Sequence, residues 1–163
     1  AAAPAEAAEE KNSFKVKRYR DLRNRIRKAI PSPAGSKGVY LERGQAGELR
    51  VLDNEDEIIA FLSGIGFEIV EPGRLSAAGI AAKMLDASVV VSVEDSHLSH
   101  AIFPLRDQGT LLVIQPPDRF ATPFKEITDG LDMTFAFLVG ERTDNGFSVS
   151  LDDLRRLLDR ITP

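Results

Sequence analysis

Both histidines of the chain lie in one short polar segment, VEDSHLSH at residues 93–100. His97 and His100 are three residues apart, so in a helix they share one face. With Glu94 or Asp95 they could form a metal site, although H-x-x-H is a common spacing and no stronger metal-ligand pattern accompanies it. The ordinary interpretation is that one histidine bonds a backbone carbonyl while the other faces a cleft. Proton shuttling or contact with a sugar is the functional alternative.

The same segment separates two apolar runs, which predicts that a buried strand ends there and a helix begins. Asp95 or Ser96 is a suitable cap for this helix, and the first amides of a helix attract anions. Two adjacent carboxylates, those of Glu94 and Asp95, would repel a diphosphate unless arginines or a divalent cation intervene. The segment is therefore a candidate anion or sugar site with a helix cap as its ordinary interpretation.

Arginines follow two other predicted strands. Arg43 and Arg50 flank the glycines of the loop 42–50, and arginine offers forked, charge-assisted hydrogen bonds to phosphate. Arg119 lies in QPPDRF, residues 115–120, directly after another predicted strand. Neither a P-loop nor a G-x-G-x-x-G motif is present. A polar loop with solvated arginines remains the alternative interpretation.

Strands are expected to alternate with helices along most of the chain, at residues 39–43, 67–72, 88–93, 110–115 and 133–140. This alternation predicts a doubly wound α/β fold with a five-stranded, mainly parallel, Rossmann-like sheet. We expect the strand order 2-1-3-4-5, in which the direction of winding reverses between the first and third strands. Ligands of such sheets bind at the carboxyl ends of the strands near that point, where the loops 42–50 and 93–100 should meet.

Short sequence motifs predict where two helices of this domain begin and where one turn lies. Asn54, with Glu57 three residues later, predicts a capping box at the start of the first helix after residue 50. Ser150 is the expected cap of the last helix. The dipeptide at residues 145–146, Asn-Gly, predicts a turn.

The N-terminal part of the chain is strongly basic. Residues 11–28 hold nine Lys or Arg against one acid, whereas residues 37–163 hold 12 basic and 21 acidic residues, a balance of −9. The stripe Tyr19, Leu22 and Ile26, continued by Ile30, predicts an amphipathic helix. We expect it to pack on its own domain or on a missing neighbour, because too few aromatic residues interleave with its charges for nucleic-acid binding.

The predicted organisation has three parts: a disordered or linker segment at 1–12, a basic connector helix and loop at 13–36, and a Rossmann-like domain at 37–163. The length of 163 residues suffices for one domain with a core. Without cysteine the chain has no disulfides or thiolate zinc sites. No apolar stretch is long enough to span a membrane. We expect a cytoplasmic protein.

Several spaced motifs resemble a known family: Y-x-x-R at a strand end, R-x-x-x-N-E-D-E-I, G-F-E-I-V-E-P, the polar segment after an apolar strand, and V-I-x-x-P. Over about residues 37–140 the chain resembles the C-terminal half of glycosyltransferase family 61, whose bacterial members are often labelled capsular polysaccharide biosynthesis proteins. The resemblance implies the Rossmann-like half of a two-domain GT-B-type enzyme, which holds a nucleotide-sugar donor.

On this resemblance, Arg43 and Arg50 match arginines of the family. The polar segment departs from it, since Glu94, Asp95 and His97 stand where many members carry a His-Gly-Ala-Gly-Leu-like run. His97 or Ser96 would then replace the usual donor contacts.

The leading hypothesis is therefore the donor-binding half of a glycosyltransferase in polysaccharide biosynthesis, with a UDP-sugar as the expected donor. Its substrate-binding candidates are Arg43, Arg50, Glu94, Ser96, His97, His100 and Arg119. The catalytic residues are unknown, and Mg²⁺ or Mn²⁺ is an optional cofactor. The acceptor half would come from a missing N-terminal domain or a partner subunit. Two rivals remain: a non-catalytic α/β interaction module that docks a partner through the basic helix, and a small phosphoryl-handling enzyme that uses Asp118 or the Glu94–Asp95 pair with a metal.

Overall fold

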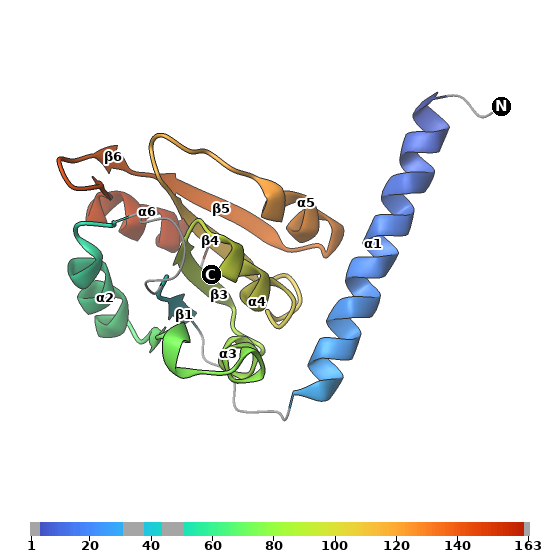
Figure 1. Ribbon diagram of the computed structural model, residues 1–163, viewed down its shortest axis with the longest axis horizontal. Helices are drawn as coiled ribbons and strands as arrows, with labels where there is room; N and C mark the ends of the chain where they lie inside the picture. The colour runs from blue at the N-terminus through green and yellow to red at the C-terminus, as the bar shows by residue number, and fades with distance from the viewer. Residues whose placement is uncertain (1–3, 31–37, 44–50, 162–163) are drawn as a thin grey trace.

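Five parallel strands form the central sheet of the protein (Figure 1). The structure, a computed structural model, describes residues 4–30, 38–43 and 51–161. The strand order is β2-β1-β3-β4-β5, and each neighbouring pair is parallel, so the predicted order is confirmed. The strands are β1 (Gly38–Leu41), β2 (Glu68–Val70), β3 (Val89–Val93), β4 (Thr110–Gln115) and β5 (Thr134–Val139).

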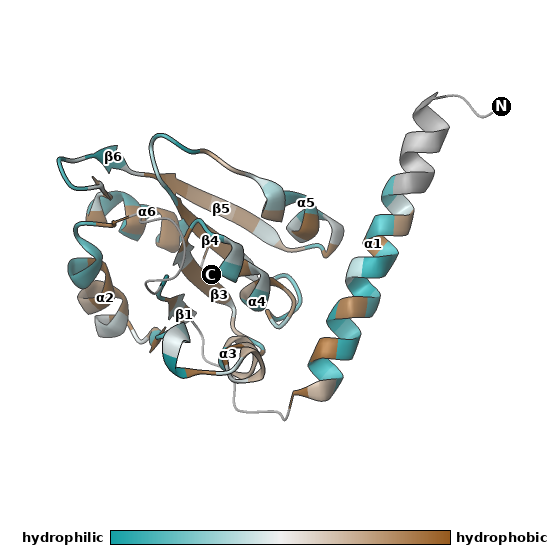
Figure 2. Ribbon diagram, in the orientation of Figure 1, coloured by the Kyte–Doolittle hydropathy of each residue, from teal (hydrophilic) through white to brown (hydrophobic). Residues whose placement is uncertain are grey.

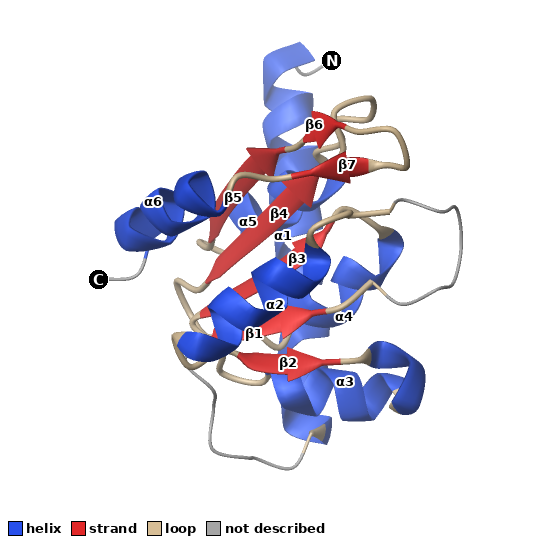
Figure 3. Cartoon of the chain, turned by 90° about the vertical axis from the view of Figure 1, so that its left-hand side faces the viewer, coloured by secondary structure: helices blue, strands red, loops and turns tan. Residues whose placement is uncertain are grey.

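Helices cover both faces of this sheet (Figure 3). One apolar core lies between the sheet and α3 (Ala77–Met84), α4 (Ser99–Ile102) and α5 (Pro123–Gly130). A second core lies on the opposite face, under α2 (Glu55–Gly64) and α6 (Leu151–Ile161). Every residue of β3 and β4 is buried, because a central parallel strand has a helix layer on each side. Two 3₁₀ turns, η1 (Pro72–Arg74) and η2 (Ser96–Leu98), complete the connections.

The caps of the helices follow the predictions only in part. The hydroxyl of Ser150 accepts a hydrogen bond from the amide of Asp153 (3.2 Å), so the predicted cap of α6 is confirmed. The capping box at Asn54 is wrong, because its side chain makes no capping bond to α2. It instead donates to the carbonyl oxygen of Val149 (2.8 Å) and accepts from the amide of Val149 (3.2 Å). Asn54 thus fastens the start of α2 to the segment that enters α6.

A small hairpin follows the sheet. β6 (Glu141–Arg142) pairs antiparallel with β7 (Phe147–Ser148), and the predicted Asn-Gly turn lies between them. Leu52 forms an isolated bridge with Phe147, so this hairpin also contacts the chain that precedes α2.

The basic helix α1 (Pro4–Ala29) is present and lies beside the sheet domain (Figure 1). It begins within the segment 1–12 for which the sequence predicts disorder or a linker. Ile26 and Ile30 pack against Ala81 and Leu85. Leu22, expected in the apolar stripe, is 41% exposed.

Arg23 occupies the buried position that the sequence analysis gave to Leu22. It is 8% exposed, and its guanidinium donates to the carbonyl oxygen of Leu105. The teal and brown residues of α1 in Figure 2 show how polar and apolar side chains alternate around this helix. Since residues 22 and 23 both lie within one turn of Tyr19 and Ile26, sequence spacing alone did not decide which of them faces the domain.

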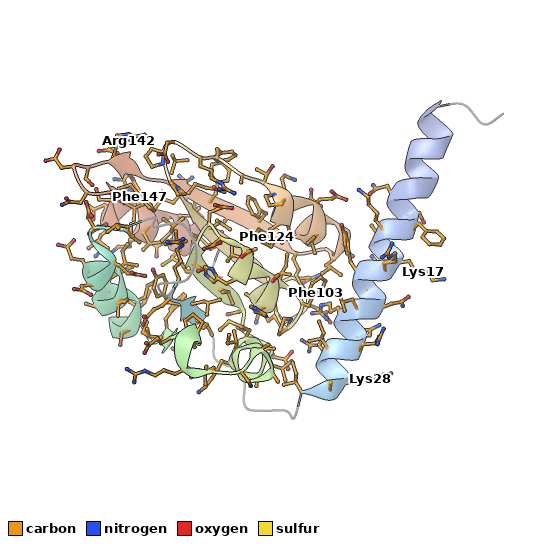
Figure 4. All side chains as sticks on the ribbon, in the orientation of Figure 1. Lys17, Lys28, Phe103, Phe124, Arg142 and Phe147 are labelled. Atoms are coloured by element: carbon orange, nitrogen blue, oxygen red, sulfur yellow. The ribbon has the colours of Figure 1, made fainter. Side chains whose placement is uncertain are left out.

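Further basic side chains of α1 also contact the domain, and Figure 4 draws the side chains of this helix and of the domain beside it. Arg27 donates to the carbonyl oxygen of Pro104 (2.7 Å). Lys15 pairs with Glu126 (2.8 Å), and Arg20 pairs with Asp132 (3.1 Å). The helix therefore packs on its own domain, as expected, and some of its basic side chains form ion pairs with acids of that domain. The alternative function, docking of a partner through this helix, stays a prediction.

In the described part of the chain, no helix has both the length and the apolar composition needed to cross a membrane. The cytoplasmic location stays a prediction.

Candidate functional site

The carboxyl ends of β1 and β3 meet, as the predicted topology requires. Arg43 follows β1 and Asp95 follows β3, and the Nε of Arg43 lies 2.9 Å from Oδ2 of Asp95. The Arg43 side chain is only 8% exposed. The expected proximity of the ends of β1 and β3 is confirmed, and the part-buried ion pair fixes the polar segment against the end of β1.

Asp95 also holds the start of η2. Its Oδ1 accepts a hydrogen bond from the amide of Ser96 (2.6 Å), so Asp95 is the cap that the sequence allowed. Burial raises the pKa of Asp95, but the Ser96 amide and the Arg43 guanidinium outweigh it and hold this pKa below its usual value. The carboxylate is therefore charged at neutral pH.

The helix start itself differs from the expected anion site. The short helix that the sequence predicts is divided into η2 and the four-residue α4. Both are too short for an appreciable helix dipole, and the carboxylate of Asp95 already occupies the Ser96 amide. An incoming anion would have to displace that carboxylate, which Arg43 also holds.

His97 belongs to a hydrogen-bond chain that reaches β1. The hydroxyl of Ser92 donates to the carbonyl oxygen of Leu41 (2.6 Å) and lies 2.8 Å from Nε2 of His97. Because the only proton of that hydroxyl points to Leu41, Ser92 must accept from His97. The proton of the neutral imidazole is therefore on Nε2, and Nδ1 is left as an acceptor.

The surroundings of His97 favour its neutral form. Burial lowers its pKa to about 4; Asp95 opposes this shift, whereas the electrostatic interactions with Arg43 and His100 act in the same direction as burial. Nδ1 lies 3.9 Å from Oδ2 of Asp95, which is too long for a hydrogen bond. At neutral pH this histidine can accept a hydrogen bond but has no second proton to give.

The loops after β3 and β4 are joined by a second charged pair. Glu94 is buried, and its Oε2 lies 3.8 Å from Nε of Arg119, whose side chain is 53% exposed. The loop that carries Arg119 is held by Gln115, which donates to the carbonyl oxygen of Ala121 (2.8 Å) and accepts from its amide (3.3 Å). Arg119 is thus a partly exposed cation on a fixed loop.

The remaining candidates divide as follows. His100 lies on α4, close enough to His97 to lower its pKa. Ser96 is exposed. Arg50 lies outside the described residues. Asp118 pairs with Arg142 (3.1 Å) at the surface. The carboxylate that a phosphoryl-handling enzyme would use to bind a metal therefore already has a cationic partner.

Across residues 4–30, 38–43 and 51–161, the structure has no group of three or more His, Cys, Asp or Glu side chains arranged to hold a metal. The optional Mg²⁺ or Mn²⁺ remains a prediction for experiment.

Sequence reasoning missed two hydrogen-bonding side chains that support the candidate site. Ser92 is a lone hydroxyl in an otherwise apolar strand, and Gln115 is a buried amide at the end of another. A polar residue at a buried strand position needs a hydrogen-bond partner, which is the signal that could have found both.

A third pair lies at the end of β1. The buried hydroxyl of Tyr40 donates to Oε1 of Glu55 (2.7 Å), and burial raises the pKa of this tyrosine. Burial also raises the pKa of Glu42, with further contributions from Glu55 and Glu71. Among the described residues at the β1–β2 side of the sheet edge, the carboxylates of Glu42, Glu55 and Glu71 lie close enough to interact, and Arg74 offsets part of their charge.

This arrangement is that of a doubly wound α/β protein with buried polar groups gathered at the carboxyl ends of its strands. Residues 3–113 match the family described as Glycosyltransferase 61. The match covers more than half of the chain, and the protein belongs to this family of glycosyltransferases. It extends through α1, which the motif comparison left outside, and ends within β4, so Arg119 lies beyond it.

The comparison with curated proteins gives no match. Among solved structures, the chain is similar to the CMP N-glycosidase BcmB of Clostridium botulinum, with 10% identity and a TM-score of 0.41, over 63% of this chain and 89% of that one. A similarity at this level supports no conclusion on function.

Proposed function

We propose that this chain is the donor-binding half of a glycosyltransferase of the GT-B type that acts in polysaccharide biosynthesis. The observation that carries the proposal is the match of residues 3–113 to the glycosyltransferase family. The crevice at the carboxyl ends of β1, β3 and β4 is the proposed place of the nucleotide-sugar donor. The acceptor and the catalytic base belong to another domain or subunit.

Arg119 is the proposed contact to the diphosphate. A nucleotide diphosphate leaves with negative charge, and a fixed cation stabilises that charge as it develops. Arg119 is half exposed on a loop that Gln115 fastens, which allows it to reach a ligand without unfolding its surroundings. Its neighbour Glu94 keeps the side chain over the end of β3 before the donor binds.

Arg43 has a different role in this proposal. Its guanidinium is buried and pairs with Asp95, so it positions the polar segment instead of contacting phosphate directly. His97 then contributes its Nδ1 acceptor to a sugar hydroxyl. Its lowered pKa favours such a contact over proton shuttling.

The test is a binding titration of the chain with UDP and a panel of nucleotide sugars, with and without Mg²⁺ or Mn²⁺, read by thermal shift and calorimetry. We expect stabilisation by at least one diphosphate nucleotide at millimolar concentration. Arg119→Ala should weaken its binding about tenfold or more, the usual effect of losing a charge-assisted hydrogen bond.

Arg156→Ala is the matched control. Arg156 is also an exposed arginine that pairs with an acid, Asp153, but it lies on α6. Equal binding by wild type and Arg119→Ala would exclude the assigned diphosphate contact. No stabilisation by any nucleotide would contradict the donor-binding function itself.

A further inference from the structure

The last strand of the sheet has an apolar, uncharged edge. β5 lies at one end of the strand order, and no strand in the described part of the chain pairs with its other side (Figure 3). Its sequence, TFAFLV, contains neither charge nor proline. Natural edge strands usually carry such residues, because they prevent pairing with another chain.

The hydrogen bonds between β4 and β5 show which backbone groups of β5 face outward. The amide of Thr134 donates to the carbonyl of Gly109, and the amide of Gly140 donates to the carbonyl of Gln115, each at 2.9 Å. Because the backbone direction alternates along a strand, the even-numbered residues of β5 face β4. The N–H and C=O groups of Phe135, Phe137 and Val139 therefore face the open edge.

The same residues expose apolar side chains. α5 covers the beginning of β5, where Phe135 packs against the first core (Figure 1). Beyond it, Phe137 and Val139 are each 47% exposed. Phe120, itself exposed, meets Phe137 edge to face, with ring centroids 4.9 Å apart. Backbone groups and apolar side chains thus lie along one continuous margin.

We propose that β5 pairs antiparallel with β5 of a second copy of this chain, and that the two sheets form one continuous sheet across a two-fold axis. The outward-facing residues are centred on Phe137. Pairing about that centre places Phe137 opposite its own copy and Phe135 opposite Val139, and each pair exchanges its N–H and C=O groups. Such a contact is isologous, as closed dimers require.

Charge favours the same pairing. Asp132 precedes β5 and Arg142 follows it, and both side chains are largely exposed. An antiparallel register centred on residue 137 brings the turn before β5 of one chain near the hairpin that follows β5 of the other. Each end of the shared strands therefore brings Asp132, which pairs with Arg20 in its own chain, near Arg142, which pairs with Asp118 in its own chain. A parallel arrangement would place like charges together.

The test uses the chain at roughly 1 to 500 µM in analytical ultracentrifugation, a range that includes weak specific dimers. We expect a dimer that dissociates on dilution. Phe137→Lys and Phe137→Glu should each be monomeric, because like charges face each other on the axis, and an equimolar mixture should form a heterodimer. Phe14→Lys, at an exposed position on α1, is the control and should dimerise as the wild type does.

A monomeric wild type at the highest concentration would overturn the proposal, as would a mixture of the two charged variants that stays monomeric. If either variant fails to fold, hydrogen exchange of the wild type decides. The amides of Phe135, Phe137 and Val139 should exchange more slowly in the dimer than in the monomer, and unchanged rates at these positions would exclude β5 pairing.

Discussion

Protonation of His97 should destabilise the fold, and the size of the effect follows from its pKa. Burial lowers the pKa of His97 from 6.5 to about 4. A pKa unit corresponds to 1.36 kcal/mol, so full protonation costs about 3 kcal/mol. The physical reason is that burial penalises the charged imidazolium and the guanidinium of Arg43 repels it, whereas the carboxylate of Asp95 offsets part of this cost.

The direction of the pH dependence is fixed by the same shift. Between pH 6.5 and about 4 the unfolded chain binds a proton at His97 that the folded chain does not. Stability is therefore complete above pH 6.5 and falls as the pH is lowered toward 4. At pH 5 we expect a loss of about 2 kcal/mol from this residue alone.

Urea unfolding at several pH values measures this loss, with His97→Gln as the reference variant. Glutamine keeps an amide donor for Ser92 but has no titrating group, so the difference between the two proteins isolates the histidine. Groups that do not interact with His97 contribute equally to both proteins, whereas Asp95 interacts with it, so the difference includes the coupling of His97 to Asp95. A wild type that keeps a constant advantage over His97→Gln from pH 7 to 4 would refute the reasoning, and so would an imidazole NMR titration with a midpoint near 6.5.

Three further substitutions test the buried polar contacts, each by chemical unfolding. Arg23→Met should cost about 1–3 kcal/mol because the loop after α4 loses a buried donor, whereas Arg20→Met, at an exposed pair, should cost less than about 1 kcal/mol; equal costs would contradict the burial of Arg23. Tyr40→Phe should cost about 1 kcal/mol through loss of one buried hydrogen bond, and an unchanged stability would show that this bond has no net value. Asp95→Asn should cost about 2–3 kcal/mol because the ion pair between Asp95 and the largely buried Arg43 side chain is lost, and a neutral or stabilising effect would mean that this ion pair makes no net contribution to stability.

The sheet could be predicted from sequence because its signals are local and repeated. Apolar runs such as residues 88–93 and 110–115 are buried on both faces, and the helices between them force parallel pairing. The capping signal at Asn54 failed for the opposite reason. Its partner, Val149, lies 95 residues away, and no local pattern indicates such a contact.

The location of the candidate site could be predicted from the sequence, but the roles of its individual residues could not. Topology alone brings Arg43 to Asp95. Whether an arginine is buried, as Arg43 is, or half exposed, as Arg119 is, depends on side-chain packing that spacing does not encode. This difference in burial decides which of the two arginines holds the polar segment in place, as Arg43 does, and which is exposed enough to contact a ligand, as Arg119 is.

The charges at the sheet edge also decide where a diphosphate would lie within the proposed crevice. Around the end of β1, burial and the charges of Glu55 and Glu71 already raise the pKa of Glu42, so a further anion is disfavoured there. On the β3–β4 side the buried Glu94 is accompanied by Arg119. Binding that needs no metal and is weakened by Arg119→Ala would place the diphosphate over β3 and β4. Binding that requires Mg²⁺ or Mn²⁺ and is unaffected by Arg119→Ala would place it on the acidic side, where a divalent cation must offset the carboxylates.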